Sequence, residues 1–199
     1  MITPDHAGLT GVVHGLTRIG AATPPRLCCV RQNASGASAT TPVELPDPGW
    51  GAWSTEEIAL AVQGFAEHLV RPSAATRALL AEAGGDRITA VGLSYPAAVL
   101  TVDDPAFAER ERRRAVGGSV APIQELERHR SARAGLVAAI DGRVHMALCF
   151  ENGPVADLDP SREEAVAPRL VRALVAVAVG VATVTRGEGY AHHLPDPRL

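Results

Sequence analysis

His145 is the residue whose type and position could most readily carry chemistry. It lies in segment 134–150, where two apolar runs flank Asp-Gly, a pair that favours a tight hairpin turn. The alternation of side chains along a strand then places His145 on the same face as Arg143 and Cys149. A histidine on such a face could act as an acid–base or binding group. The alternative is a histidine hydrogen-bonded to a neighbour beneath a covering helix.

A cluster of arginines is the second candidate. The run ERERRR at 109–114 follows a helix start at Asp104-Pro105, so its arginines would lie on a helix. Guanidinium groups there could contact phosphates or an acidic partner, although a charged helix face is often simply solvated. We therefore take as candidate binding residues Arg143, His145, Arg110, Arg112 and Arg113, and no catalytic set is identified.

Three further patterns predict neither a nucleophile nor a metal. GLSYP lacks the second glycine of a nucleophile elbow, so Ser94 is expected in a turn. Glu125 and His129 have helical i, i+4 spacing, which is equally typical of a charged solvent-facing helix. Asp157 and Asp159 precede an expected helix, where carboxylates favour the helix dipole. We expect no metal and no cofactor.

Composition excludes several kinds of chemistry. All 19 basic residues are arginine, so lysine Schiff bases, a P-loop lysine and a Ser-Lys dyad are excluded. The net charge of −3 provides no overall basic field, and nucleic acid is not an expected partner. Absence of lysine together with abundant alanine, glycine and proline is typical of a GC-rich bacterial genome.

The cysteines and the N-terminal residues indicate a cytoplasmic protein. Cys28, Cys29 and Cys149 form no CxxC spacing and are poorly arranged for disulfides, so buried thiols are expected. The first residues lack the basic region and apolar run of a signal peptide.

Segment 169–187 could be a strand, a core helix or a membrane anchor. Only 13 residues from Ala173 to Thr185 lack charge, fewer than the roughly 20 needed to span a bilayer. Its valines alternate as in a strand, but Ser161 and Glu164 form a capping box upstream, and apolar residues recur about every fourth position. We predict a buried helix over 161–185.

The other elements follow from capping residues, apolar periodicity and turn residues. Helices are expected at 3–19 with Thr3 as N-cap, at 54–70 with a Ser54 capping box, at 73–84, from 104 and at 121–132. Strands are expected at 26–32 and in one or two pieces after Arg87, whereas 33–52 is expected to be a mobile loop.

The Asp-Gly turn also predicts a register for the hairpin. A two-residue turn places Ile140 opposite Arg143, Ala138 opposite His145 and Leu136 opposite Ala147. The other face carries only apolar side chains and should meet the core: Val144, Met146, Leu148 and Phe150.

Together these patterns predict an α+β protein, with a small antiparallel sheet centred on the 134–150 hairpin and packed against several helices. Residues 1–199 are expected to form one domain. With no complete catalytic constellation, we expect a non-enzymatic regulatory or assembly protein that binds another protein chain, as a homodimer through its apolar terminal helix. The alternative is a small hydrolase or transferase with His145 as acid–base residue. No membrane partner is expected.

Overall fold

The computed structural model is an α+β fold built on one antiparallel sheet, as predicted. The structure describes residues 4–19, 23–43, 54–100, 103–120, 123, 129–151, 153–159 and 168–187. The helices are α1 (His6–Thr17), α2 (Thr55–Val70), α3 (Ala74–Glu82), α4 (Pro105–Ala115) and α5 (Pro168–Arg186), with a short 3₁₀ helix η2 (Gly85–Arg87). The strands are β1 (Arg26–Gln32), β2 (Ser38–Val43), β3 (Ile88–Val99), β4 (Arg130–Ala139), β5 (Val144–Phe150) and β6 (Val155–Leu158), in the sheet order β2-β1-β3-β4-β5-β6.

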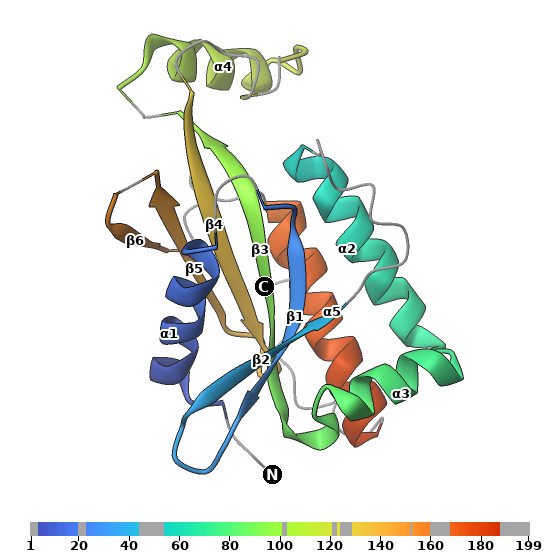
Figure 1. The fold of residues 1–199 in the computed structure, drawn as a ribbon. Helices are drawn as coiled ribbons and strands as arrows, with labels where there is room; N and C mark the ends of the chain where they lie inside the picture. Colours follow the sequence, from blue (N-terminus) through green and yellow to red (C-terminus); the bar gives the residue numbers. More distant parts are fainter. Residues whose placement is uncertain are drawn as a thin grey trace.

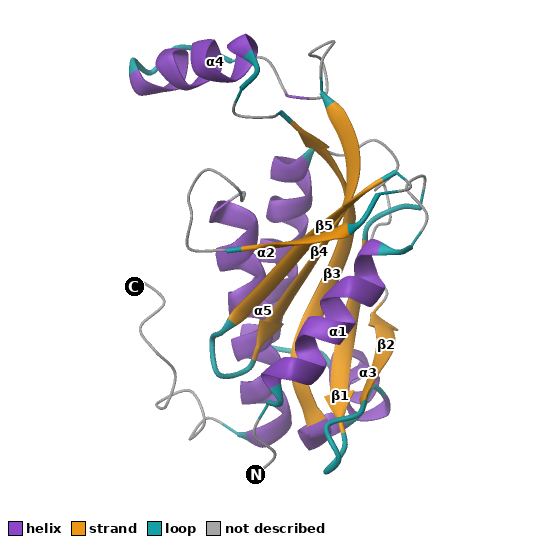
Figure 2. Cartoon of the chain, turned by 90° about the vertical axis from the view of Figure 1, so that its left-hand side faces the viewer, coloured by secondary structure: helices purple, strands orange, loops and turns teal. Residues whose placement is uncertain are grey.

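Helices cover both faces of the sheet (Figures 1 and 2). Helices α2 and α5 cover one face and enclose the larger apolar core. Of the described helices, α1 covers the other face and encloses a smaller core around Leu9, Val13 and Val137. Because side chains alternate along β1, Cys28 faces α1 while Cys29 faces α2. Adjacent cysteines therefore point to opposite faces of the sheet.

The apolar terminal segment is a buried helix, α5. Its apolar stripe packs against α2, β3 and β4, with Leu170, Leu174 and Val177 fully buried. A Cβ at Gly180 would lie 2.9 Å from the Cβ of Leu69, so this glycine permits close approach of α5 to α2. The predicted capping box at Ser161 and Glu164 lies outside the described residues. The apolar stripe of the terminal helix is therefore buried within the chain.

The hairpin is present, but its predicted register is wrong by one residue. Leu136 lies opposite Met146, Val137 opposite His145 and Ala138 opposite Val144. The turn is longer than two residues, because Ala139 N–H bonds to Arg143 O and Gly142 adopts a positive φ of 89°. The predicted apolar face of β5 does meet the α2–α5 core, since the strand keeps its alternation.

Several other expectations need correction. The predicted 33–52 loop contains β2, an edge strand whose alanine, threonine and valine residues pair with β1; residues 44–53 lie outside the described part. Helix α1 begins at His6 with Asp5 as N-cap, and Thr3 is not among the described residues. The predicted 121–132 helix overlaps the start of β4, and most of its other residues lie outside the described ranges.

Ser94 also differs from its predicted place in a turn. It is fully buried within β3, which runs without a break through the SYP segment. Its hydroxyl donates a 2.7 Å hydrogen bond to Leu16 O and accepts one from Arg133 Nε. Ser94 therefore links α1 to the sheet instead of serving as a nucleophile.

Helix α4 projects from the end of the sheet. Figures 1 and 2 show it beyond the ends of β3 and β4, apart from the helices that cover the sheet. Among the described elements, no helix or strand packs substantially on α4. The predicted start is correct, because Asp104 Oδ1 accepts a 2.8 Å hydrogen bond from Ala106 N–H.

Candidate functional site

His145 lies beneath α1 and contacts a second histidine. On β5 it faces α1, where its Nε2 is 3.0 Å from His6 Nδ1. The two imidazole rings are stacked with centroids 5.2 Å apart. The sequence analysis left open whether His145 is an acid–base or binding group or is hydrogen-bonded beneath a helix. In the structure a helix covers His145, and its partner on that helix, His6, is itself titratable.

Asp141 extends this contact into a chain of three groups. His6 Nε2 lies 3.0 Å from Asp141 Oδ2, on the turn between β4 and β5. A carboxylate can only accept, so His6 Nε2 carries the proton. When both rings are neutral, this leaves His6 Nδ1 to accept from His145 Nε2–H. Arg143 stands beside the same carboxylate, with its exposed Nε 3.9 Å from Asp141 Oδ2.

A second histidine–carboxylate pair lies further along α1. His14 Nε2 is 2.6 Å from Asp157 Oδ1 on β6, a strand that the sequence analysis missed. We name the five residues of these two groups the histidine cluster: His6, His14, Asp141, His145 and Asp157. Both contacts tie α1 to the β4–β6 end of the sheet.

The surroundings of His145 disfavour its charged form. Its pKa is lowered from the ordinary value, first by partial burial and then by the neighbouring His6. Arg143 acts in the same direction, whereas Asp141 and Asp157 act in the opposite direction.

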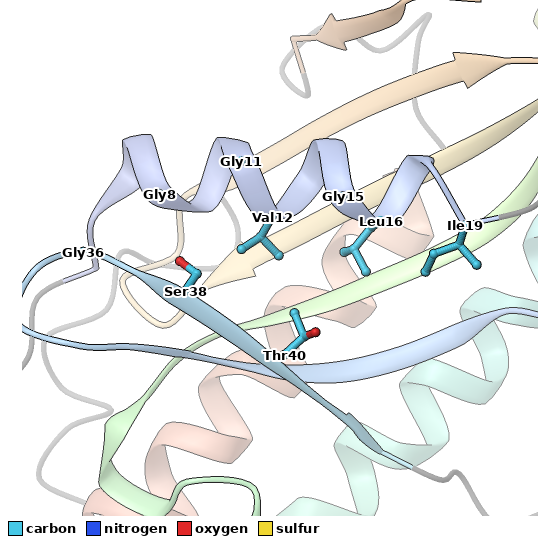
Figure 3. A pocket seen from close by; sticks show the side chains of 9 residues that line it. All are labelled: Gly8, Gly11, Val12, Gly15, Leu16, Ile19, Gly36, Ser38 and Thr40. Carbon is cyan, nitrogen blue, oxygen red and sulfur yellow. The ribbon is translucent and has the colours of Figure 1, made fainter. Parts of the chain in front are cut away.

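A groove of about 490 Å³ runs along the other flank of α1 (Figure 3). In Figure 3 the side chains of Val12, Leu16 and Ile19 point from α1 toward β2. We name this feature the α1 groove, and its lining residues are Gly8, Gly11, Val12, Gly15, Leu16, Ile19, Gly36, Ser38 and Thr40. It is mainly apolar, with two hydroxyl side chains on the β2 side.

The glycines of α1 differ in what the fold requires of them. A Cβ at Gly8 would lie 2.8 Å from both Gly36 O and Gln32 Nε2, so close packing requires glycine there. At Gly11 and Gly15 a Cβ would meet nothing within 4 Å. Glycine inside a helix costs about 1 kcal/mol relative to alanine. At those two positions no contact among the described residues compensates for this cost.

The predicted binding residues do not form one site. Arg143 and His145 meet at Asp141, whereas Arg110, Arg112 and Arg113 lie on the projecting α4. Glu109 pairs with Arg112 and, at 2.9 Å, with Arg113, so intrahelical ion pairs partly neutralise the cluster.

The described part of the chain shows no cluster of metal-ligating side chains, and two of its thiols are deeply buried. No group of three or more histidine, cysteine, aspartate or glutamate side chains there could hold a metal ion. Glu125, the proposed partner of His129, lies outside that part. Burial raises the pKa of Cys28 to about 11 and that of Cys29 to about 12, so neither thiol ionises near neutral pH.

Sequence reasoning missed His6 and His14, the partners that give His145 its setting. They occur at i, i+8 on α1, and Thr10 lies between them at i+4, so all three share one flank of the helix. Polar residues at this spacing, beside the apolar stripe of the same helix, could have been recognised in the sequence as a candidate polar surface. Its partners lie more than 130 residues away in the chain, with separations of 135, 139 and 143.

Helix α5 is long and apolar enough to cross a membrane by length and composition, with a mean hydropathy of 1.5 over an 18-residue window. This is weak evidence, because a core helix passes the same test, and here α5 packs against α2, β3 and β4.

In comparisons with known proteins, the chain matches no family model, and no curated protein or solved structure shows significant similarity to it.

Proposed function

We propose that this protein is a non-enzymatic regulatory or assembly protein of the bacterial cytoplasm that acts by binding another protein chain, in the first place a second copy of itself. The observation that carries the proposal is the α1 groove beside Gly11 and Gly15. These glycines weaken α1 without allowing any close contact inside the described fold. Residues that weaken a helix, and that no contact inside the fold requires, are expected at functional surfaces.

A second copy is a suitable occupant because the exposed ridge of α1 is self-complementary. Small residues form the ridge, with Ala7, Gly11 and Gly15 all exposed, and exposed Asp5 and Arg18 lie at its two ends. Two antiparallel copies of α1 would place each Asp5 opposite the Arg18 of the other copy. Backbones can approach closely along small residues, and a two-fold axis then uses the same patch twice.

Size-exclusion chromatography with light scattering tests the proposal. We expect a dimer at micromolar concentration for the wild-type chain and a monomer for Gly11→Leu, whose side chain would fill the contact. Gly64→Leu is the matched control, because Gly64 is an exposed helix glycine in α2 with nothing within 4 Å of its Cβ position. A wild-type monomer, or a Gly11→Leu dimer as strong as that of Gly64→Leu, would contradict the proposal.

Charge gives an independent test of the same surface. Arg18→Glu would place two carboxylates opposite one another, whereas Arg18→Gln only removes the attraction. We expect Arg18→Glu to weaken the dimer more than Arg18→Gln, and the difference to shrink at high salt. Equal effects of the two substitutions would argue against the antiparallel arrangement.

A second candidate function rests on the Asp141–His6–His145 chain. Asp141 orients His6, and His6 in turn holds the imidazole of His145, which would be the acid–base residue of a small hydrolase or transferase. Assays with activated esters and phosphoesters test this candidate. Activity abolished by His145→Gln but not by His68→Gln would favour it over binding alone.

A further inference from the structure

Helix α1 is attached to the sheet by apolar packing and by titratable groups. Leu9, Val13 and Leu16 are buried beneath it, while His6 and His14 bond to residues of the β4–β5 turn, β5 and β6. The α1 groove lies on the opposite flank of the same helix. Any change in how α1 is seated therefore changes one wall of the groove.

The His6–His145 contact can hold one added proton but not two. In the neutral pair, His6 donates from Nε2 to Asp141 and accepts at Nδ1 from His145. With one added proton, the ring that carries it donates across the contact, and the neutral ring accepts in the tautomer that leaves its facing nitrogen without a hydrogen. With a second proton both rings are cations, and two N–H groups face each other across the same 3.0 Å contact.

We infer that the Asp141–His6–His145 chain is a proton-sensitive latch: binding of the second proton separates the two imidazoles, releases the N-terminal half of α1 from β5 and opens the wall of the α1 groove. The inference rests on the proposed function for its biological meaning, because it describes the regulation of that same surface. Assembly through α1 is then favoured near neutral pH and lost under mild acid.

The charged groups around His145 determine the pH range in which the latch opens. His6 faces it from α1, Asp141 and Arg143 from the β4–β5 turn and Asp157 from β6, while Val137 on β4 lies opposite it. Since the pKa of His145 is lowered in the fold, the unfolded chain binds the proton more tightly than the folded chain. Stability is therefore complete above the unfolded pKa of about 6.5 and is lost as the pH falls toward the lower folded pKa.

Hydrogen exchange of the α1 amides tests the latch directly. Between pH 7.5 and 5, we expect wild-type α1 protection, normalised to that of α5 amides, to fall about tenfold per pH unit in the range where the second proton binds. His145→Gln should abolish this dependence, because a neutral amide at the Nε2 position can donate or accept without gaining charge. His68→Gln is the control, since His68 bonds to Thr76 of α3, on the face of the sheet opposite α1, and its loss should leave the wild-type profile.

Two results would overturn the latch: wild-type α1 protection that does not change with pH, or a His145→Gln profile that falls as the wild type does. If His145→Gln fails to fold, titration of the imidazole C–H resonances in the wild-type chain decides instead. The latch requires His145 to gain its proton together with chemical-shift changes in α1 amides, and titration without such changes contradicts it.

Light scattering at pH 7.5 and 5.5 separates the latch from the proposed function. A monomer at both pH values, with α1 exchange that depends on pH, contradicts dimer formation but supports the latch. A dimer that persists at pH 5.5 while α1 amides exchange freely refutes the proposed regulation. A dimer at pH 7.5 that dissociates at 5.5 in the wild type, but not in His145→Gln, supports both.

Discussion

Arg133 shows how a single buried cation can position a helix. Its side chain is only 2% exposed, and burial lowers its pKa to about 10, so it remains charged at neutral pH. Its guanidinium donates to Ser94 Oγ at 2.8 Å, to Pro24 O at 3.0 Å and to Thr23 O. Ser94 in turn donates to Leu16 O near the C-terminal end of α1, where the helix dipole favours positive charge.

Replacement of Arg133 should therefore destabilise the protein more than its volume change implies. Arg133→Met keeps an apolar stem but removes the donor to the buried Ser94 hydroxyl and to the part-buried carbonyls of Thr23 and Pro24. We expect a loss of about 1–3 kcal/mol in the free energy of unfolding. Urea denaturation measures it, with Arg77→Met on the exposed face of α3 as control. A loss equal to that of the control would mean that solvent replaces these bonds at little cost.

At the level of the element, the glycines of α1 allow the proposed surface to be separated from folding. Within the single chain, Gly11→Ala adds a methyl group in open space and removes a glycine from a helix, so we expect about 1 kcal/mol of added stability for the monomer. Gly8→Ala should destabilise instead, because its Cβ would lie 2.8 Å from Gly36 O. Thermal unfolding of the two variants gives the comparison, and a shift of the same sign in both would contradict this assignment of the glycines.

The elements with local signals were predictable from the sequence, and those defined by distant pairing were not. The capping box at Ser54 marks the start of α2 because its hydrogen bonds lie within four residues. Edge strands β2 and β6 carry no comparable signal, since each is defined only by the strand beside it. The hairpin register failed for a related reason: Asp-Gly identifies a turn but does not determine its length.

The candidate site was predictable only in part for the same physical reason. His145 could be placed on the correct strand face, because alternation is local. Its contact with His6 depends on where α1 crosses the sheet, and apolar packing of Leu9, Val13 and Leu16 decides that. Sequence alone therefore named one residue of the histidine cluster as a candidate but could not assemble the cluster.

In the whole molecule, α4 stands apart from the fold that carries the α1 groove. It extends beyond the β3–β4 ladder, whose last pair is Val99 and Arg130, and Val116 just after it is 79% exposed. A helix of 11 residues gains little stability alone in water. Since the described sheet and helices do not rest on α4, we expect the arm, defined as residues 101–129, to be dispensable for folding.

A shortened chain tests this separation. Replacing residues 101–129 with Pro-Asp-Gly keeps Leu100 and joins β3 to β4 through a four-residue turn of a favoured type. We expect the free energy of unfolding to change by less than about 1 kcal/mol, because no other described helix or strand packs substantially on α4. Dimer formation at pH 7.5 should also remain, since the α1 groove lies on another part of the sheet. A shortened chain that folds but stays monomeric would move the assembly surface from α1 to the arm.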